Sequence, residues 1–512
     1  MQTERVVVVG AGVAGLVAAL DLAARGLDVC VLGRASTPGG KMREVNITGA
    51  RLDAGPTVFT MRSVFEQIFA DAGASFADHV ALRPLEILAR HAWSAQERLD
   101  LFSDVHRSAD AIGAFAGLAE ARGYLQFCAD ARRIYQTLDR SFIHAARPGL
   151  IDLVRAAGFA GLGNLWQIRP FTSMWQALGQ RFRDRRLQQL FGRYATYCGS
   201  CPFLAPATLM LVAHVEQDGV WSVEGGMHRL VTALAHVAMQ RGARFRYSAD
   251  AVDVIFRRER ITGVKLATGE QVHADHVIVN ADIAAAASGR LGPAAAGAVR
   301  RVPNAARSLS AVTWSLVAQT GGFPLLRHNV FFSDDYAAEF DDIFYHERLP
   351  AAPTVYVCAQ DRDDRPRAGA AAERLLCLIN APPSGDSHNS QAAEIEQCEE
   401  RTFNRLAHLG LLVERRPETT VMTTPADFER LFPGTGGALY GPATHGWRAS
   451  FRRAGARSRV PGLYFAGGST HPGPGVPMAA LSGRLAAATL MSDLASTRGS
   501  RAMATPGGTS MR

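Results

Sequence analysis

The sequence predicts an α/β protein in which a parallel sheet is assembled from separated segments and a second domain is inserted between them. A β-branched run at residues 6–9 leads through a glycine-rich turn into a helical stretch. Blocks of strand and helix character return at 225–283 and 463–492, separated by segments of different texture at 75–220 and 300–435. A chain of 512 residues exceeds the length at which one hydrophobic core stops growing, so two domains are expected.

The first block predicts a βαβ unit that starts at residue 5. Residues 6–9 form a buried strand, residues 14–25 have helical composition, and residues 28–32 form the next strand. The turn between strand and helix has the spacing G-x-G-x-x-G, which in this position predicts a dinucleotide site. Gly10 permits the tight turn, Gly12 lets the backbone approach a pyrophosphate, and Gly15 lets helix and strand pack closely. The predicted contacts of this turn, which include N–H groups at the helix start, are Gly10, Gly12, Val13, Ala14 and Gly15.

The end of the second strand lacks the acidic residue that usually accepts hydrogen bonds from the adenosine ribose. Gly33 stands at that position and Arg34 follows it. An arginine there suits a 2′-phosphate, so this segment taken alone leaves NADP open as an alternative. The other interpretation is that the ribose contacts come from backbone or water. Both residues are predicted to contact the nucleotide.

The later blocks complete the predicted Rossmann-like domain. The second block contains a helix, a hairpin around 267–270 and a strand at 277–280, and the third contains a strand at 463–466, a Gly/Pro loop and a helix at 477–490. We therefore expect a nucleotide domain formed by residues 1–75, 225–300 and 440–495. The inserted α+β domain is expected at 76–224 and 301–439, and the low-complexity tail at 496–512 is expected to be disordered.

Composition restricts the environment of the protein. Hydrophobic residues make up 47% and charged residues 20%, as in ordinary globular proteins, and the net charge of +8 favours acidic partners. The seven cysteines are scattered, and the pair Cys198 and Cys201 is interpreted as inert rather than redox-active. The apolar stretch at 6–24 is interrupted by glycines and Asp21, so neither a signal peptide nor a membrane-spanning helix is expected. No metal site is predicted.

Two further motifs carry a family resemblance. Gly39-Gly40-Lys41 follows the first unit, with Asp53-Ala54-Gly55-Pro56-Thr57 behind it, and residues 460–477 read VPGLYFAGGSTHPGPGVP. With these motifs the chain resembles the flavoprotein superfamily of amine oxidases and carotenoid desaturases, and it is most similar to the bacterial-type carotenoid desaturases. The resemblance implies FAD as the cofactor. It implies further FAD contacts at Gly39, Gly40, Lys41, Pro56, Thr57, Val252, Gly467, Gly468, Gly475, Val476, Pro477 and Met478.

Within that family the chain looks most similar to the 1-hydroxycarotenoid 3,4-desaturases, which act on hydroxyneurosporene or methoxyneurosporene. The resemblance rests on the T-H-P-G-P-G loop and on the stretch from Tyr440 to Trp447. It implies FAD-dependent C-3,4 dehydrogenation of an acyclic 1-hydroxy- or 1-methoxycarotenoid. Three alternatives stay open: a phytoene-type desaturase acting on an earlier carotene, an amine oxidase, and a non-catalytic protein that binds flavin and carotenoid.

Desaturation removes a hydride and a proton, and a flavin is the natural acceptor of the hydride. The helix at 477–490 would direct its positive end toward the pyrimidine edge of the flavin. His471, in the neighbouring loop, is the candidate catalytic residue, either as proton acceptor or as a brace for the loop. Asp53 is expected to be a structural hydrogen-bond acceptor. The number of bonds formed and the final electron acceptor, oxygen or a quinone, are left open.

A basic, aromatic segment predicts how the substrate arrives. Residues 147–193 contain eight arginines against Asp152 and Asp184, with phenylalanine and tryptophan between them. This composition suits a lipid interface, and also RNA or a solvated helix face. Because a carotenoid is dissolved in the bilayer, we expect peripheral binding to the cytoplasmic face of a bacterial membrane and no nucleic-acid partner.

Overall fold

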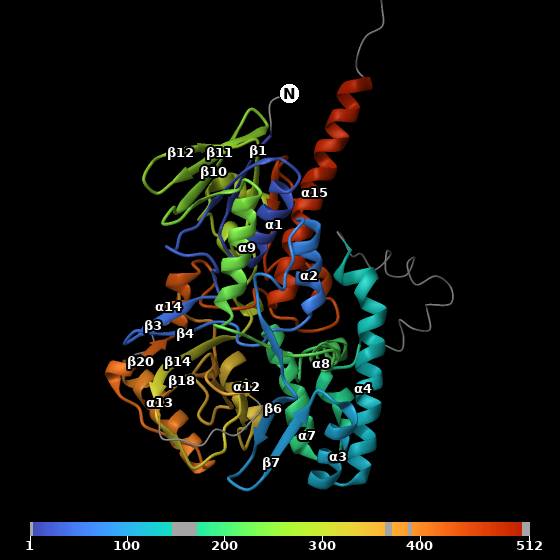
Figure 1. Cartoon of the computed structure of the whole chain (residues 1–512), viewed down its shortest axis with the longest axis vertical. Coiled ribbons are helices and arrows are strands. Elements are labelled where there is room, and N and C mark those ends of the chain that lie inside the picture. The colour runs from blue at the N-terminus through green and yellow to red at the C-terminus, as the bar shows by residue number, and fades with distance from the viewer. Residues whose placement is uncertain (1–3, 146–170, 364–370, 388–391, 504–512) are drawn as a thin grey trace, which may run out of the picture.

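The computed structural model describes residues 4–145, 171–363, 371–387 and 392–503. Figure 1 shows two parts stacked along the longest axis of the molecule. The part that contains β1, α1 and α9 is built on a parallel sheet, and the part that contains β6, β14 and β18 on a larger mixed sheet.

The parallel sheet brings three distant pieces of chain side by side. Its strand order is β21-β13-β1-β2-β9, and every neighbouring pair is parallel. The carboxyl ends of all five strands therefore meet at one edge, where parallel sheets bind their ligands. The strands are β1 (Arg5–Val9), β2 (Asp28–Leu32), β9 (Arg244–Arg246), β13 (His276–Val279) and β21 (Leu463–Phe465).

Helices cover one face of this sheet. Every residue of α1 (Val13–Ala23) is buried, because it packs between the sheet, α9 (His228–Gln240) and α15 (Val476–Met503). A Cβ atom at Gly483 of α15 would lie 2.2 Å from the carbonyl oxygen of Ala14, so only glycine permits this approach. The opposite face is covered by an antiparallel sheet and two short helices. These are β10 (Ala251–Arg257), β11 (Arg260–Leu266), β12 (Gln271–His273), α10 (Ile283–Ala287) and α11 (Gly292–Ala298).

The second part is organised on a seven-stranded sheet of order β20-β14-β18-β17-β16-β6-β7, antiparallel except between β16 and β6. Its strands are β6 (Ile87–Ala92), β7 (Arg98–Phe102), β14 (Ser310–Ala318), β16 (His328–Phe331), β17 (Val355–Ala359), β18 (Glu373–Ala381) and β20 (Thr420–Thr423). Its helices are α3 (Val105–Ala116), α4 (Leu118–Leu138), α6 (Met174–Gly179), α7 (Arg185–Gly192), α8 (Leu211–Gln217), α12 (Tyr336–Phe344), α13 (Ala392–His408) and α14 (Pro425–Leu431).

The remaining elements are short. The two-stranded sheets pair β3 (Glu44–Ile47) with β4 (Ala50–Asp53), β5 (Leu82–Pro84) with β8 (Trp221–Val223), and β15 (Thr320–Gly321) with β19 (Leu412–Val413). Single helical turns are η1 (Asp139–Ile143), η2 (Arg193–Cys198), η3 (Ala207–Met210), η4 (Asn304–Ala306), η5 (Pro417–Thr419) and η6 (Ser450–Arg452).

The α/β fold expected from the sequence is confirmed, including the first βαβ unit and the hairpin of β11 and β12. All strands of the parallel sheet fall within residues 1–75, 225–300 and 440–495. One helix differs from expectation, since α15 continues to Met503 and so passes into the segment expected to be a disordered tail. Among the described residues, no helix combines the length and the hydropathy needed to cross a bilayer.

Candidate functional site

Asn280 joins the three pieces of chain at the carboxyl edge of the parallel sheet. Its Oδ1 atom accepts a hydrogen bond of 2.9 Å from the N–H of Gly15, and its Nδ2 atom donates one of 3.1 Å to the carbonyl of Ala466. Its backbone N–H donates to the carbonyl of Val9 at 2.7 Å. One carboxamide thus fixes the glycine turn against the ends of β13 and β21.

Two glycines of the first turn have the roles predicted for them. Gly10 has a φ of +106°, and a Cβ there would lie 2.5 Å from the carbonyl oxygen of Asn280. A Cβ at Gly15 would lie 2.1 Å from the carbonyl oxygen of Gly10. The tight turn and the close packing of helix on strand therefore both require glycine.

The structure adds a second reason for glycine at position 12, besides the predicted approach of the backbone to a pyrophosphate. A Cβ at Gly12 would point at Oδ1 of Asn280, 2.9 Å away, so the side chain of Asn280 requires glycine here. Gly12 is the N-cap of α1 and has no side-chain cap, and the N–H groups of Val13 and Ala14 lie in the first turn of the helix. N–H groups in that turn have no intrahelical acceptor, so they can hold an anion.

The second glycine pair lies against the first turn, as an extended site requires. The N–H of Gly39 donates to the carbonyl of Ala11 at 2.8 Å, and Gly39 forms an isolated parallel bridge with Gly12. A Cβ at Gly40, where φ is +60°, would lie 3.2 Å from the Cα of Gly12. Two motifs predicted separately are therefore neighbours in space.

Lys41 is not a solvated surface lysine. Its Nζ donates to the carbonyl of Leu439 at 2.6 Å and lies 5.5 Å from the centre of the Phe432 ring. Burial lowers the pKa of Lys41, and the nearby carboxylate of Asp282 acts in the opposite direction. The ammonium group thus ties the G-G-K turn to the segment before Tyr440.

Arg34 does not present its charge to a nucleotide phosphate. Its guanidinium donates to the carbonyls of Arg430 and Leu431, at 2.5 and 2.8 Å, and so binds the C-terminal end of α14. Cations stabilise such helix ends. A Cβ at Gly33 would lie 3.1 Å from the ring of Tyr247, which leaves little room for an acidic side chain there. The NADP alternative loses its only support.

The segment before Val252 lies beside Gly33. The N–H groups of Ser248 and Ala249 donate to the carbonyls of Ala35 and Gly33. Val252 follows in β10, partly exposed. This places backbone next to the end of β2, where an adenine is bound in dinucleotide folds.

The C-terminal loop contains a cradle of glycine backbone. Gly467 has a φ of +136°, and its N–H donates to Oγ of Ser482 at 3.1 Å. A Cβ at Gly468 would meet nothing closer than the Cα of Pro474 at 3.6 Å. Neither backbone strain nor protein contact therefore demands glycine at 468, as expected where the backbone lies against a cofactor. Gly475, with a φ of +111°, precedes α15, whose first residues are Val476, Pro477 and Met478.

Thr57 and Asp53 belong to another segment of the candidate site, the one that follows the G-G-K turn in the sequence. Oγ1 of Thr57, next to Pro56, lies 2.7 Å from the hydroxyl of Tyr356. The carboxylate of Asp53 accepts from the N–H groups of Met227 and His228, at 2.8 and 3.2 Å, which confirms its expected structural role. Burial raises the pKa of Asp53, and these two hydrogen bonds lower it.

His471 is buried, with a neutral ring. Its backbone N–H donates to the carbonyl of Ala454, and its ring packs edge-on against Phe142 with centroids 4.9 Å apart. Within the described residues neither ring nitrogen has a hydrogen-bond partner. Burial lowers the pKa of His471 to about 4, although the nearby carbonyls of Phe142 and Ala145 raise it. The ring therefore lies against Phe142 and near two carbonyl groups, a position that suits either of the two roles expected for it.

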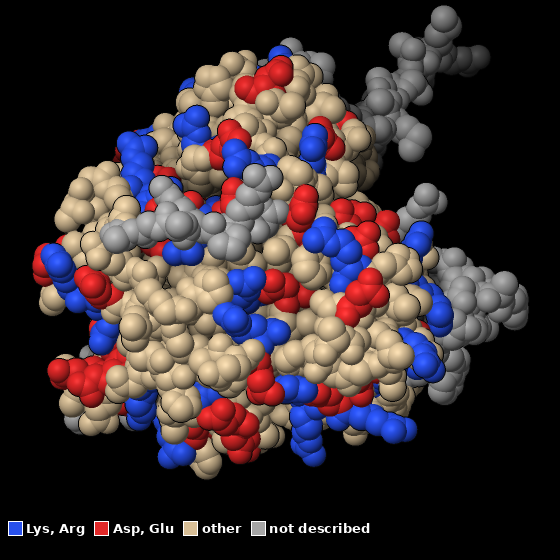
Figure 2. Space-filling view, turned by 60° about the horizontal axis from the view of Figure 1, so that its bottom comes forward, with Lys and Arg blue, Asp and Glu red and all other residues tan. Residues whose placement is uncertain are grey.

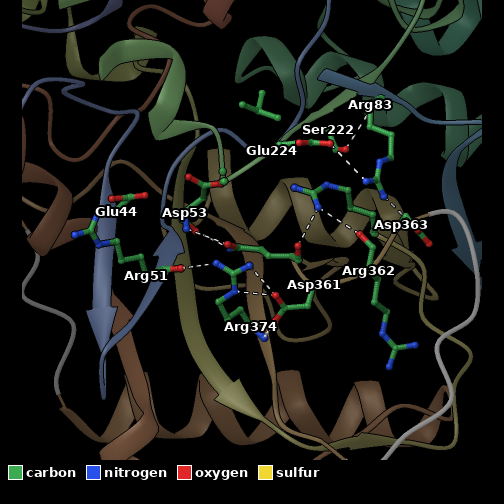
Figure 3. A pocket seen from close by; sticks show the side chains of 15 residues that line it. Glu44, Arg51, Asp53, Arg83, Ser222, Glu224, Asp361, Arg362, Asp363 and Arg374 are labelled. Atoms are coloured by element: carbon green, nitrogen blue, oxygen red, sulfur yellow. Dashed lines mark hydrogen bonds and ion pairs between the residues drawn. The ribbon is translucent and has the colours of Figure 1, made fainter. Parts of the chain in front are cut away.

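The polar pocket in Figure 3 cannot hold a hydrocarbon chain. It has a volume of about 260 Å³ and opens beside Asp53. Arg374 and Asp361 pair across it at 2.6 Å, and Arg83 lies 3.5 Å from Glu224. Such walls favour water and ions, so an apolar ligand must bind elsewhere.

A different interior region contains a group of enclosed polar side chains. Six ionisable residues in it are surrounded by protein, and each keeps part of its surface accessible. They are Lys41, Arg193, Tyr197, Tyr356, Tyr440 and Arg453.

The described part of the basic, aromatic segment is divided between the interior and the surface. The rings of Phe182 and Phe191 are each 1% exposed and belong to the core. Arg181 pairs with Asp130 at 2.6 Å, and Arg186 pairs with Asp184 at 2.6 Å. These groups lie in the core or are paired with carboxylates, whereas Phe171, Arg183 and Arg185 of the same segment are exposed. Residues 146–170 of the segment lie outside the described residues.

The two cysteines of the C-x-x-C pair are free thiols. Burial raises the pKa of Cys198 to about 11 and that of Cys201 to about 12. The thiolate is the nucleophilic form of cysteine, so the raised pKa values agree with the prediction that this pair is inert.

Comparisons with known proteins agree with a flavin site at this edge of the sheet. Residues 13–491 match the model of the family described as flavin containing amine oxidoreductase. The chain is 56% identical to a hydroxyneurosporene desaturase of Rubrivivax gelatinosus, over 100% of this chain and 98% of that protein. It is 32% identical to a zeta-carotene-forming phytoene desaturase of Myxococcus xanthus, over 96% of this chain and 94% of that protein. A solved oxidoreductase from Methanosarcina mazei shares the fold with a TM-score of 0.60 at 16% identity, over 95% of this chain and 100% of that chain.

Proposed function

Because the chain belongs to the family of flavin-containing amine oxidoreductases, we propose that it desaturates the C-3,4 bond of an acyclic 1-hydroxy- or 1-methoxycarotenoid. The protein is an FAD-dependent oxidoreductase. One observation carries the choice of substrate: identity to the hydroxyneurosporene desaturase is 56%, against 32% to the phytoene desaturase, over nearly the same length. This difference favours an oxygenated substrate over an earlier carotene.

We place the FAD along the edge of the parallel sheet. The N–H groups of Val13 and Ala14 would hold the diphosphate, with the turns at Gly12 and Gly40 beside it. Gly468 and the N-terminus of α15 would lie against the flavin. When bound there, FAD supplies a two-electron acceptor for a hydride.

The protein's part in the reaction is alignment and removal of a proton. Hydride departure from the carbon beside the polyene leaves positive charge that the polyene delocalises, which makes the neighbouring C–H acidic. A weak base then suffices, and the neutral imidazole of His471, with unpaired ring nitrogens and a pKa of about 4, meets that need. Burial of the apolar chain inside the protein would supply most of the binding free energy.

The substrate test uses expression in cells that accumulate neurosporene, with and without a hydratase that adds the terminal hydroxyl. We expect the carotenoid spectrum to shift to longer wavelength only in the hydroxylated background. A shift in cells that make neurosporene alone would support the phytoene-type alternative. The absence of a shift in both would contradict the proposed function.

We propose that the molecule reaches its substrate by peripheral binding to an anionic membrane. The proposal rests on an exposed aromatic and basic cluster: Phe171 is 65% exposed, its ring lies 5.2 Å from that of Trp447, and Arg448 stacks on Trp447 at 4.7 Å. Such side chains suit the boundary between head groups and acyl chains. On the face in Figure 2, basic and acidic side chains are interspersed.

Co-sedimentation with phosphatidylglycerol vesicles tests the membrane proposal. We expect the double variant Phe171→Ser/Trp447→Ser to lose most of the binding, because apolar anchoring is removed. Phe256→Ser is the matched control, since it changes an exposed aromatic residue on β10. Unchanged sedimentation of the double variant would refute this binding face.

A further inference from the structure

An interior cluster of polar side chains lies beside the candidate FAD site. A hydrocarbon chain could not form hydrogen bonds with these side chains. We define the cluster as Arg193, Tyr197, Glu216, His328, Tyr336 and Tyr356. These residues come from η2, α8, β16, α12 and β17, so the tertiary fold rather than one motif brings them together.

Arg193 is the centre of this cluster. Its guanidinium donates to the hydroxyl of Tyr197 at 3.0 Å, and its central carbon lies 5.2 and 5.3 Å from the ring centres of Tyr197 and Tyr356. No carboxylate in the described part of the chain lies within ion-pair distance of it. A guanidinium has five N–H donors, and within the described residues the hydrogen bond to Tyr197 is the one that the side chain of Arg193 forms.

Two buried residues near Arg193 have polar atoms without a hydrogen-bond partner among the described residues. His328 shares a hydrogen bond of 2.7 Å between Nδ1 and the hydroxyl of Tyr356, but its Nε2 has no partner among the described residues. The hydroxyl of buried Tyr336 is likewise without a partner there. Burial lowers the pKa of His328 to about 3, with help from Arg327 and Arg193, so the ring is neutral. Unpaired buried polar groups cost free energy, so several in one place indicate a ligand that pairs with them.

The cluster adjoins both sides of the candidate FAD site. Tyr356 reaches Thr57 through the 2.7 Å contact between the hydroxyl and Oγ1. On the other side Tyr440 lies near Arg193, and its carbonyl accepts from Arg453, which also donates to the carbonyl of Gly468 at 3.1 Å. A substrate atom at the cluster would therefore lie beside the reacting carbons.

We propose that this cluster binds the oxygen atom at the end of the carotenoid, with Arg193 as the principal donor, and so selects oxygenated over unmodified substrates. The inference rests on the proposed function. In a 1-hydroxy- or 1-methoxycarotenoid the oxygen-bearing carbon is two bonds from C-3, so its recognition site must adjoin the site of hydride removal. Both oxygens accept a hydrogen bond from a guanidinium. A site built to bond a substrate oxygen rejects the analogue that lacks it, because its own polar groups stay unpaired.

The variant Arg193→Met tests this inference, because it keeps the length of the side chain and removes all donors. Steady-state kcat/KM is measured with 1-hydroxyneurosporene and with neurosporene. We expect kcat/KM for the hydroxylated substrate to fall on the order of 10- to 100-fold, with little loss for neurosporene. Arg301→Met, the same change at an exposed position, is the control and keeps the preference.

Flavin content and the flavin absorption spectrum of the variant separate the outcomes. Equal loss on both substrates, or a shifted flavin spectrum, would overturn the inference by assigning Arg193 to the cofactor. Tyr336→Phe is the second variant if Arg193→Met fails to fold, and it should reduce the same preference to a smaller extent; an unchanged preference there would also overturn it. If the wild-type protein oxidises neither substrate, the proposed function itself fails.

Discussion

At the scale of single residues, the site depends on Asn280 as much as on the glycines around it. Its carboxamide bonds Gly15 and Ala466, and its atoms fill the space that a Cβ at Gly10 or Gly12 would need. The glycine motif therefore acts together with Asn280, because the position of this residue decides where a Cβ atom cannot be accommodated. The motif at 10–15 reveals the turn but not this partner.

The substitution Asn280→Ala should weaken both the fold and FAD retention. It leaves the N–H of Gly15 and the carbonyl of Ala466 without partners, and each unsatisfied buried group costs about 1–3 kcal/mol. Released FAD per chain and the melting temperature measure the effect. Asn404→Ala, on the exposed side of α13, should leave both quantities unchanged. Full FAD content and an unchanged melting temperature in Asn280→Ala would show that Asn280 does not hold the site together.

At the scale of elements, the sequence predicts what depends on local pattern. The strand and helix boundaries of the first βαβ unit agree to within a residue or two, because β-branched runs and glycine turns are local signals. Orientation is not local. Phe182 and Arg181 have the composition of a membrane surface, but the fold turns the ring into the core and pairs the guanidinium with Asp130, fifty-one residues earlier.

In the candidate site, too, the sequence predicts local motifs but not the contacts between distant residues. Gly39, Gly40 and Lys41 are predictable as a motif, and the structure adds that they adjoin Gly12 and Leu439. Arg34 shows the limit of such reasoning, because its position suits a phosphate while its guanidinium binds the end of α14. The polar cluster around Arg193 has no sequence signature, since it comes from five elements.

At the scale of the whole molecule, we propose that the cofactor is held by one of the two parts seen in Figure 1 and that the other encloses most of the substrate. The parallel sheet takes strands from three distant pieces of chain, and the seven-stranded sheet carries His328 and Tyr356. The contact between Tyr356 and Thr57 lies at the boundary between the two parts. Separated segments must therefore fold together before either ligand can bind. The central claim is that FAD and an oxygenated carotenoid meet at this boundary.

Anaerobic mixing of the purified protein with 1-hydroxyneurosporene tests that claim most directly. In the absence of an electron acceptor, each protein molecule can oxidise one bond and must keep the electrons. We expect the absorption of oxidised flavin to disappear while the carotenoid spectrum shifts to longer wavelength, one equivalent for each FAD. A carotenoid that binds while the flavin stays oxidised would contradict the claim and identify the protein as a carrier without turnover.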